Sequence, residues 1–172
     1  MPHRGAVRNF PIVAETRHLR VLIVCSGNTC RSAMAEVVLR RLLEEAGRPA
    51  EVRSAGTHAL AGAPANPEAV AAVAAAGLDL TAHRTQPLTS PLVGWADVIL
   101  GMQPAHIRSV LEIDPAAPAR LVTAFDPNRG GGRGGIRDPF GGPSEMYAEV
   151  LAELQSCLSG FIREGPSPAG SG

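Results

Sequence analysis

The segment from Val21 to Ser32, VLIVCSGNTCRS, constrains the fold of this chain more than any other part of the sequence. Its first four residues are apolar, which is typical of a fully buried strand. A short loop with Gly27 and Asn28 follows, and from Ala33 onward apolar residues recur at helical spacing. The loop therefore joins the carboxyl end of a strand to the amino end of a helix. Open α/β sheets bind ligands at such places, and the backbone N–H groups there attract anions.

Two reactive side chains, Cys25 and Arg31, stand at the ends of this loop with five residues between them. Backbone amides, the helix dipole and a guanidinium all favour the thiolate, which is the nucleophilic form of cysteine. Arg31 presents a planar fork that can hold two phosphate oxygens. Gly27 lets the backbone approach a ligand closely, and Asn28 tolerates a left-handed conformation. We expect the Ser32 hydroxyl to stabilise the Cys25 thiolate, both as nucleophile and as leaving group.

The run Cys25-x5-Arg31-Ser32 resembles the signature loop of the low-molecular-weight protein tyrosine phosphatase family, over about residues 19–162. The resemblance implies an α/β fold, a single flavodoxin-like domain. Its four-stranded parallel sheet would carry helices on both faces and a phosphate-binding loop directly after strand one. It also implies a cysteine-dependent protein phosphatase that forms a phosphocysteine intermediate, with catalytic Cys25 and Arg31. The alternative is a purely structural role for the two residues, with Cys25 buried at the end of a strand and Arg31 solvated. The loop residues expected to bind substrate are Ser26, Gly27, Asn28, Thr29, Cys30 and Ser32.

The rest of the chain alternates between expected helices and strands, which indicates a doubly wound parallel sheet. The expected helices cover residues 32–46, 67–76, 88–95 and 103–112, and the expected strands cover 51–55, 96–100 and 120–123. A last helix begins near residues 143–145 and docks on the core through Tyr147, Leu151, Leu154, Leu158 and Phe161. We expect residues 1–18 to form a flexible leader, 19–163 the phosphatase domain and 164–172 a disordered tail.

Length, charge and cysteine content limit the class of protein further. A chain of 172 residues is expected to form one domain with a substantial core. Its formal net charge of zero gives no indication of a nucleic-acid or membrane partner. No apolar run approaches the roughly 18 residues of a membrane span, and no signal peptide is visible. Three cysteines do not form a disulfide framework, so a reducing cytoplasmic location is expected.

No metal or other cofactor is expected. The histidines are scattered, and the spacing between Cys25 and Cys30 is not that of a typical zinc finger or ribbon. The expected partners are phosphorylated protein substrates, and we expect a monomer.

A general acid must protonate the leaving group and then activate the water that cleaves phosphocysteine. Asp138 is the best candidate, because its Asp-Pro-aromatic setting ahead of the last helix resembles the family's acid loop. Pro139 restricts Asp138 to extended geometry. Asp126 also precedes a proline and is the alternative. The Gly- and Arg-rich segment 126–137 is expected to be a mobile loop.

The resemblance assigns supporting roles to three further residues. Ser54, in a Ser-Ala-Gly-Thr run, and His83 would support Asn28 from behind the loop, although a histidine in such a setting is more often on the surface. Cys30 would form a reversible disulfide with Cys25 that protects the nucleophile from over-oxidation. The alternative for Cys30 is a small buried residue.

The sequence leaves open which phosphorylated side chain the enzyme hydrolyses. Thr29, together with Asp138-Pro-Phe-Gly-Gly, resembles the bacterial protein arginine phosphatase branch, and Phe140 would form one aromatic wall of the pocket. This favours phosphoarginine slightly over phosphotyrosine. Two other readings are an arsenate reductase on the same fold and a non-catalytic phosphate-binding module. The reductase would need closely spaced reactive cysteines, but only Cys157 follows Cys30.

Overall fold

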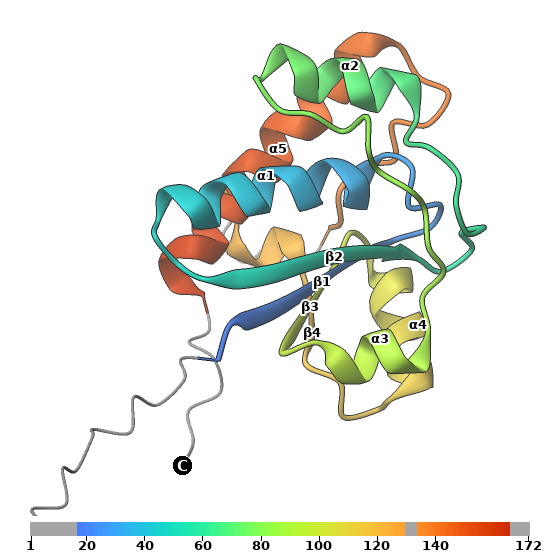
Figure 1. Ribbon diagram of the computed structural model, residues 1–172, viewed down its shortest axis with the longest axis vertical. Coiled ribbons are helices and arrows are strands. Elements are labelled where there is room, and N and C mark those ends of the chain that lie inside the picture. Colours follow the sequence, from blue (N-terminus) through green and yellow to red (C-terminus); the bar gives the residue numbers. More distant parts are fainter. Residues whose placement is uncertain (1–16, 130–133, 166–172) are drawn as a thin grey trace, which may run out of the picture.

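Four parallel strands form a single sheet in the computed structural model, which describes residues 17–129 and 134–165 (Figure 1). The strands β1 (Leu19–Cys25), β2 (Ala50–Gly56), β3 (Val98–Gly101) and β4 (Ala119–Leu121) are arranged in the order β2-β1-β3-β4. Because the order reverses between β1 and β3, the carboxyl ends of these two strands flank the crevice where such sheets bind ligands. The expected α/β fold is confirmed.

Helices cover both faces of the sheet (Figure 1). On one face α1 (Arg31–Glu45) and α5 (Ser144–Glu164) lie against the strands, and α2 (Pro67–Ala75) packs on the outside of this pair. On the other face lie α3 (Ser90–Trp95) and α4 (Pro104–Ile113). Every expected helix is present, with ends that differ by at most two residues.

Two expected strands differ from the observed ones for a tertiary reason. The third begins at Val98, since Ala96 ends α3 and the Asp97 carboxylate accepts the backbone N–H of Arg20 at 2.9 Å. The fourth ends at Leu121, because the chain then turns into a 3₁₀ helix, η1 (Val122–Phe125). The Phe125 ring packs edge-on against Phe161 of α5, with ring centroids 5.1 Å apart. Packing against α5 thus overrides the local strand preference.

The expected domain boundaries fall near the limits of the described structure. Helix α5 runs to Glu164, one residue past the expected end of the domain. Most of the expected leader (residues 1–16), residues 130–133 of the expected mobile loop and residues 166–172 of the expected tail lie outside the described residues.

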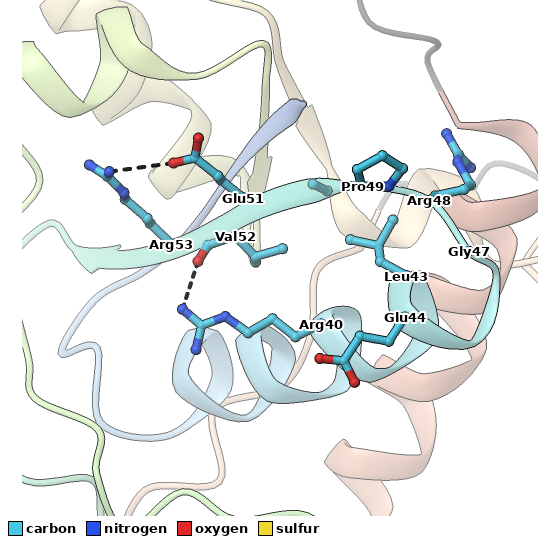
Figure 2. Close-up of a pocket in the computed structure, with 10 residues that line it drawn as sticks. Arg40, Leu43, Glu44, Gly47, Arg48, Pro49, Glu51, Val52 and Arg53 are labelled. Carbon is cyan, nitrogen blue, oxygen red and sulfur yellow. Dashed lines mark hydrogen bonds and ion pairs between the residues drawn. The ribbon is translucent and has the colours of Figure 1, made fainter. Parts of the chain in front are cut away.

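Strand β2 is an edge of the sheet, and side chains cover its outward carbonyl groups. Arg40 of α1 donates to the Val52 carbonyl at 2.9 Å (Figure 2). The Gln86 side chain donates to the Ser54 carbonyl at 2.9 Å. A cavity of about 650 Å³ lies beside the first of these contacts (Figure 2). None of the expected site residues lines it.

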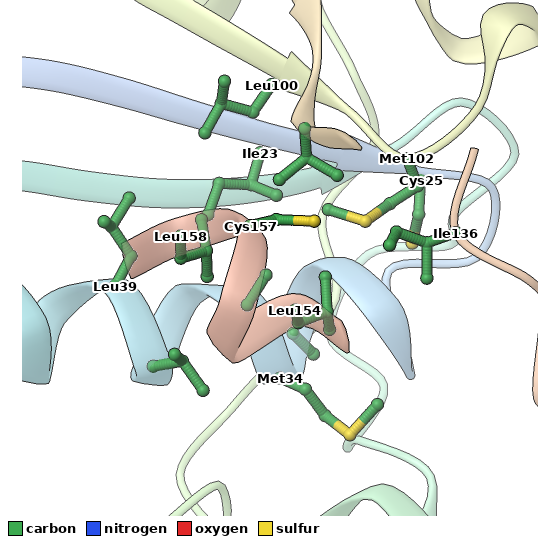
Figure 3. Packing of buried hydrophobic residues seen from close by; sticks show 14 of the residues in the cluster. Ile23, Cys25, Met34, Leu39, Leu100, Met102, Ile136, Leu154, Cys157 and Leu158 are labelled. Atoms are coloured by element: carbon green, nitrogen blue, oxygen red, sulfur yellow. The ribbon is translucent and has the colours of Figure 1, made fainter. Parts of the chain in front are cut away.

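The main core lies between the sheet and the α1/α5 pair. Leu39, Leu154 and Leu158 of these helices face Ile23 and Leu100 of the strands (Figure 3). A smaller cluster fills the space between the other face of the sheet and α3 and α4. Both faces of β1 are therefore buried, which explains its unbroken apolar sequence.

Candidate active site

The loop between β1 and α1 forms the floor of the site. It starts at Cys25, the last residue of β1, and ends at Arg31, the first residue of α1. Asn28 has a φ of 56° and is the one non-glycine residue with positive φ in the described structure. This turn directs the Asn28 backbone N–H at the Cys25 sulfur, 3.3 Å away. No side chain caps the start of α1, so the N–H groups of its first turn face the loop.

Asn28 is fully buried and anchored on every side. Its side-chain NH₂ donates to Ser32 Oγ and to Ser54 Oγ, each at 2.9 Å. Its side-chain oxygen accepts the Gln86 N–H at 3.0 Å, and its carbonyl accepts His83 Nε2–H at 2.7 Å. The structure thus brings Ser54 and His83 into contact with Asn28, as the resemblance implies. These bonds hold a conformation that otherwise costs about 1 kcal/mol or more.

The hydroxyl of Ser32 has a defined direction. Its oxygen already accepts a hydrogen bond from the Asn28 side chain, and it lies 2.9 Å from the Cys25 sulfur. Since the amide NH₂ is donor only, the Ser32 proton is left to point at the sulfur. An O–H and a backbone N–H therefore converge on the Cys25 sulfur.

Arg31 and Asp138 face each other across the pocket. The Arg31 side chain is only 3% exposed, and its guanidinium lies 3.3 Å from a carboxylate oxygen of Asp138, whose side chain is 52% exposed. A second guanidinium N–H donates to the carbonyl of Ile136 at 3.1 Å. The segment that precedes α5 is thus tied to the start of α1, and it delivers a carboxylate to the loop.

The alternative acid, Asp126, lies elsewhere. Its carboxylate accepts the Ser156 hydroxyl of α5 at 3.2 Å and pairs with Arg129 at 3.5 Å. It does not line the cavity at the loop. The geometry therefore favours Asp138 as the acid.

A cavity of about 220 Å³ opens between the loop and the Asp138 segment. Thr29 forms part of its wall, and its hydroxyl lies 3.6 Å from the Cys30 sulfur. The Phe140 ring stands at the mouth and is 71% exposed. The cavity is lined by Cys25, Gly27, Thr29, Cys30, Arg31, Asp138 and Phe140.

The two other cysteines have different surroundings. Cys30 lines the cavity, and its sulfur lies 3.8 Å from the Tyr147 hydroxyl of α5. Burial raises the pKa of the Cys30 thiol and raises the pKa of Tyr147 to about 12, so both groups stay protonated at neutral pH. Cys157 is fully buried in the main core, and burial raises its pKa to about 11. It is therefore unsuited to a disulfide relay of the kind that an arsenate reductase requires.

Three residues that support the loop were not singled out by sequence reasoning. A Cβ on Gly56 would lie 2.5 Å from the Ser26 carbonyl oxygen, so only glycine lets the end of β2 pack against the loop. Gln86 bonds to Asn28 through its backbone N–H, and Glu36 of α1 accepts the Ser54 hydroxyl. Gly56 could have been found from the sequence, because it belongs to the Ser-Ala-Gly-Thr run that resembles the family. The contacts of Gln86 and Glu36 depend on the tertiary fold.

Comparison with known proteins places this loop in a defined family. The model of the family described as "Low molecular weight phosphotyrosine protein phosphatase" matches residues 20–165. The chain belongs to that family. It is a family of cysteine-dependent hydrolases that act on phosphorylated proteins, and the position of Cys25 after β1 fits it.

The family members most similar to this chain include phosphatases of two named specificities. A protein-arginine-phosphatase of Geobacillus stearothermophilus is 37% identical over 140 residues, which cover 81% of this chain and 90% of that protein. A probable low molecular weight protein-tyrosine-phosphatase, EpsP of Ralstonia solanacearum, is 37% identical over 147 residues, covering 83% and 92%.

A solved structure of the YwlE arginine phosphatase with a phosphorylated active-site serine superposes with a TM-score of 0.79 at 30% identity, covering 85% of this chain and 95% of that one.

Neither a membrane-spanning helix nor a metal-ligand cluster is found among the described residues. None of the helices there is long and apolar enough to cross a membrane. No group of three or more histidine, cysteine, aspartate or glutamate side chains within residues 17–129 and 134–165 is arranged to hold a metal ion.

Proposed function

We propose that this phosphatase hydrolyses phosphoarginine in protein substrates in preference to phosphotyrosine, with Cys25 as nucleophile and Asp138 as general acid. The observation that carries the preference is the position of Thr29 in the wall of the 220 Å³ cavity, one residue before Cys30. The relatives supply independent support, since two of those named protein-arginine-phosphatase are 34–37% identical to this chain. We also propose that the protein acts as a cytoplasmic monomer.

The first chemical step transfers the phosphoryl group to sulfur. The Cys25 thiolate attacks phosphorus in line with the leaving atom, a nitrogen of phosphoarginine. The loop N–H groups and the Arg31 guanidinium hold the equatorial oxygens and stabilise their charge in the transition state. As the P–N bond breaks, Asp138 gives its proton to the departing nitrogen, so that the arginine side chain leaves as a guanidinium ion.

The second step regenerates the enzyme. The Asp138 carboxylate takes a proton from a water molecule, whose oxygen attacks the phosphorus of phosphocysteine and releases inorganic phosphate. The Ser32 hydroxyl, 2.9 Å from the sulfur, stabilises the thiolate as it leaves. A structure of a Cys-to-Ser mutant of the YwlE arginine phosphatase, with its active-site serine phosphorylated, supports a covalent intermediate of this kind.

The charges at the mouth of the cavity suit a cationic side chain. The Asp138 side chain is half exposed and lies beyond the buried Arg31. Once it has given up its proton, its carboxylate can pair with the departing guanidinium while Arg31 holds the phosphate. A phosphotyrosine ring would instead need a flat apolar slot, and Phe140 provides one wall of such a slot. The β-branched Thr29 narrows the space beside the phosphorus and adds a polar contact.

The test compares phosphate release from phosphoarginine and phosphotyrosine peptides of the same sequence, using wild type and Thr29→Ile. We expect wild type to prefer phosphoarginine and Thr29→Ile to move the preference towards phosphotyrosine, as measured by kcat/KM. Cys25→Ser is the negative control and should show no turnover of either peptide.

A wild-type preference for phosphotyrosine would make this a tyrosine phosphatase in which Thr29 only packs, and the EpsP relatives favour that second candidate. Turnover by Cys25→Ser would overturn the phosphocysteine mechanism. Phosphate binding without turnover of any substrate would instead indicate a non-catalytic binding module.

A further inference from the structure

His106 is a buried titratable residue that the proposed mechanism does not use, yet it contacts the phosphate loop. It lies in the first turn of α4, directly after β3, and is only 2% exposed. Its Nδ1 accepts the backbone N–H of Gln103 at 3.0 Å, and its Nε2 lies 2.9 Å from the hydroxyl oxygen of Ser26. Ser26 directly follows the nucleophile Cys25 in the loop.

These two contacts fix the tautomer of the ring. Because Nδ1 accepts a backbone N–H, it carries no proton, and the neutral ring must carry its proton on Nε2. Nε2–H therefore donates to the Ser26 oxygen. In a doubly protonated ring, the Nδ1–H of His106 would face the backbone N–H of Gln103. The hydrogen bond between His106 and Gln103 would then be lost.

The surroundings keep the ring neutral. Burial, aided by the positive charge of Arg31, lowers the pKa of His106 to about 4. Asp138 from the acid segment acts in the opposite direction, and His58, from the loop after β2, acts in the same direction as Arg31. His106 therefore stays neutral, and its Nε2–H remains a donor, at neutral and mildly acidic pH.

Ser26 is held from two sides. Its backbone carbonyl accepts the N–H of His58 at 2.9 Å, while its hydroxyl accepts from His106. With both groups fixed, the residue cannot rotate, and the N–H groups that follow it in the loop keep their direction. One of these is the Asn28 N–H that lies 3.3 Å from the Cys25 sulfur.

We propose that His106 is a positioning residue for the phosphate-binding loop: its neutral ring anchors Ser26 and so keeps the loop amides aimed at the phosphoryl group. This inference rests on the proposed function for its role in catalysis, but its first consequence is for the binding of the phosphate anion. The contact between His106 and Ser26 follows from the fold. Because the strand order reverses between β1 and β3, the start of α4 lies beside the loop after β1.

The experiment is a double-mutant cycle on Ser26→Ala and His106→Asn. The asparagine oxygen takes the place of Nδ1 and can still accept the Gln103 N–H, whereas the donor to Ser26 is lost. We expect each single variant to weaken the binding of inorganic phosphate about tenfold, which is the effect of one ordinary hydrogen bond. The double variant should be no weaker than either single variant, because both remove the same bond.

The readouts separate a positioning role from a structural one. Phosphate affinity is measured by calorimetry on the folded variants, and their melting temperatures are recorded alongside. In wild type, the ring nitrogen shifts of His106 should show the Nε2–H form without titration between pH 8 and pH 5. His18→Asn is the matched control, since this histidine is exposed, lies before β1 and does not line the cavity, and it should leave phosphate affinity unchanged.

Two results would overturn the inference. One is a roughly hundredfold loss in the double variant, which would mean that the two residues act independently. The other is a His106→Asn variant that melts at a lower temperature but binds phosphate like wild type. A wild type that binds phosphate yet hydrolyses no phosphorylated peptide would refute the proposed function and leave this inference standing.

Discussion

Single residues in this protein have roles that follow from their hydrogen-bonding capacity. Asn28 uses its NH₂ group, its side-chain oxygen and its carbonyl to hold one left-handed turn. Ser32 can stabilise the nucleophile because Asn28 already occupies its acceptor site. In both cases a neighbour decides which way a proton points, and that direction determines the chemistry at Cys25.

Replacing Asp138 by Asn should lower kcat by about 10²–10⁴-fold, the usual contribution of general acid–base catalysis. Asp126→Asn is the matched control, because Asp126 also precedes a proline but bonds to Ser156 of α5 outside the cavity. Its turnover should stay within a few-fold of wild type. Steady-state kinetics with the preferred peptide measure both variants, and a larger loss in Asp126→Asn would assign the acid role to that residue.

The stability of the protein should depend on His106 in acid. In the unfolded chain His106 takes up a proton near pH 6.5, whereas burial lowers its folded-state pKa to about 4. The unfolded state therefore binds more protons in this window, and stability is lost as the pH falls from about 6.5 towards 4. Between these limits wild type should lose about 3 kcal/mol more than His106→Asn.

Urea unfolding of both proteins at several pH values measures this difference. Titrating carboxylates contribute equally to wild type and variant, and so they cancel. Parallel curves for the two proteins would show that His106 does not change its protonation on unfolding in this range.

The pairing of Cys25 with Cys30 can be tested by oxidation. Peroxide converts the Cys25 thiolate to a sulfenic acid, and attack by the Cys30 sulfur would release water and form a disulfide. Wild type treated with excess peroxide should then recover activity on reduction by dithiothreitol. In Cys30→Ser the Cys25 sulfur should be oxidised further to the sulfinic acid, and activity should not recover. Equal recovery in both would leave Cys30 as a small buried residue that lines the cavity.

At the scale of elements, the contact between α5 and η1 depends on one glycine. A Cβ on Gly160 of α5 would lie 1.8 Å from the carbonyl oxygen of Phe125. This contact holds the chain that leads from β4 towards Asp138. The packing of two elements, and not the conformation of either, determines the residue at this position.

Gly160→Ala should destabilise the protein by about 1–3 kcal/mol, because overpacking outweighs the better helix propensity of alanine. Gly94→Ala is the matched control, since that glycine is also in a helix but its Cβ would meet nothing within 4 Å. It should be neutral or stabilising by up to about 1 kcal/mol. Denaturant unfolding gives both values, and equal effects would contradict the packing argument.

Which elements form was largely predictable from the sequence, whereas where some of them end was not. The apolar run of β1 and the spacing of Tyr147 to Phe161 in α5 predicted buried elements that the structure contains. The end of β4 at Leu121 was not predictable, because it depends on the packing of Phe125 against Phe161.

The same distinction applies to the candidate site. The loop residues from Cys25 to Ser32 form a local motif, so the sequence shows them together. Gln86 and His106 reach the loop only through the tertiary fold, and a glutamine or a histidine alone carries no signal of such a contact. Asp138 could be chosen over Asp126 by its place before the last helix, and the cavity supports that choice.

At the scale of the whole molecule, the sheet has open edges that must not pair with other chains. At β2 the side chains of Arg40 and Gln86 donate hydrogen bonds to the carbonyls of Val52 and Ser54, respectively. The protein can therefore keep an edge strand at its surface and remain monomeric, as we expect.

Removing both groups in Arg40→Ala/Gln86→Ala should expose two carbonyls and produce concentration-dependent dimers in sedimentation velocity. Wild type should sediment as a monomer. Arg41→Ala changes the neighbouring exposed arginine and should behave like wild type. A wild-type dimer, or a monomeric double variant at high concentration, would contradict this role for the two side chains.

The closure of the site by Arg31, Ile136 and Asp138 also has a consequence for biosynthesis. The nucleophile leaves the ribosome more than a hundred residues before the acid, and the Ile136 carbonyl that holds the arginine is made almost as late. A nascent chain that has exposed only β1, α1 and β2 therefore carries the thiol without Asp138, the proposed general acid. Translation itself delays activity until the segment before α5 has emerged and docked.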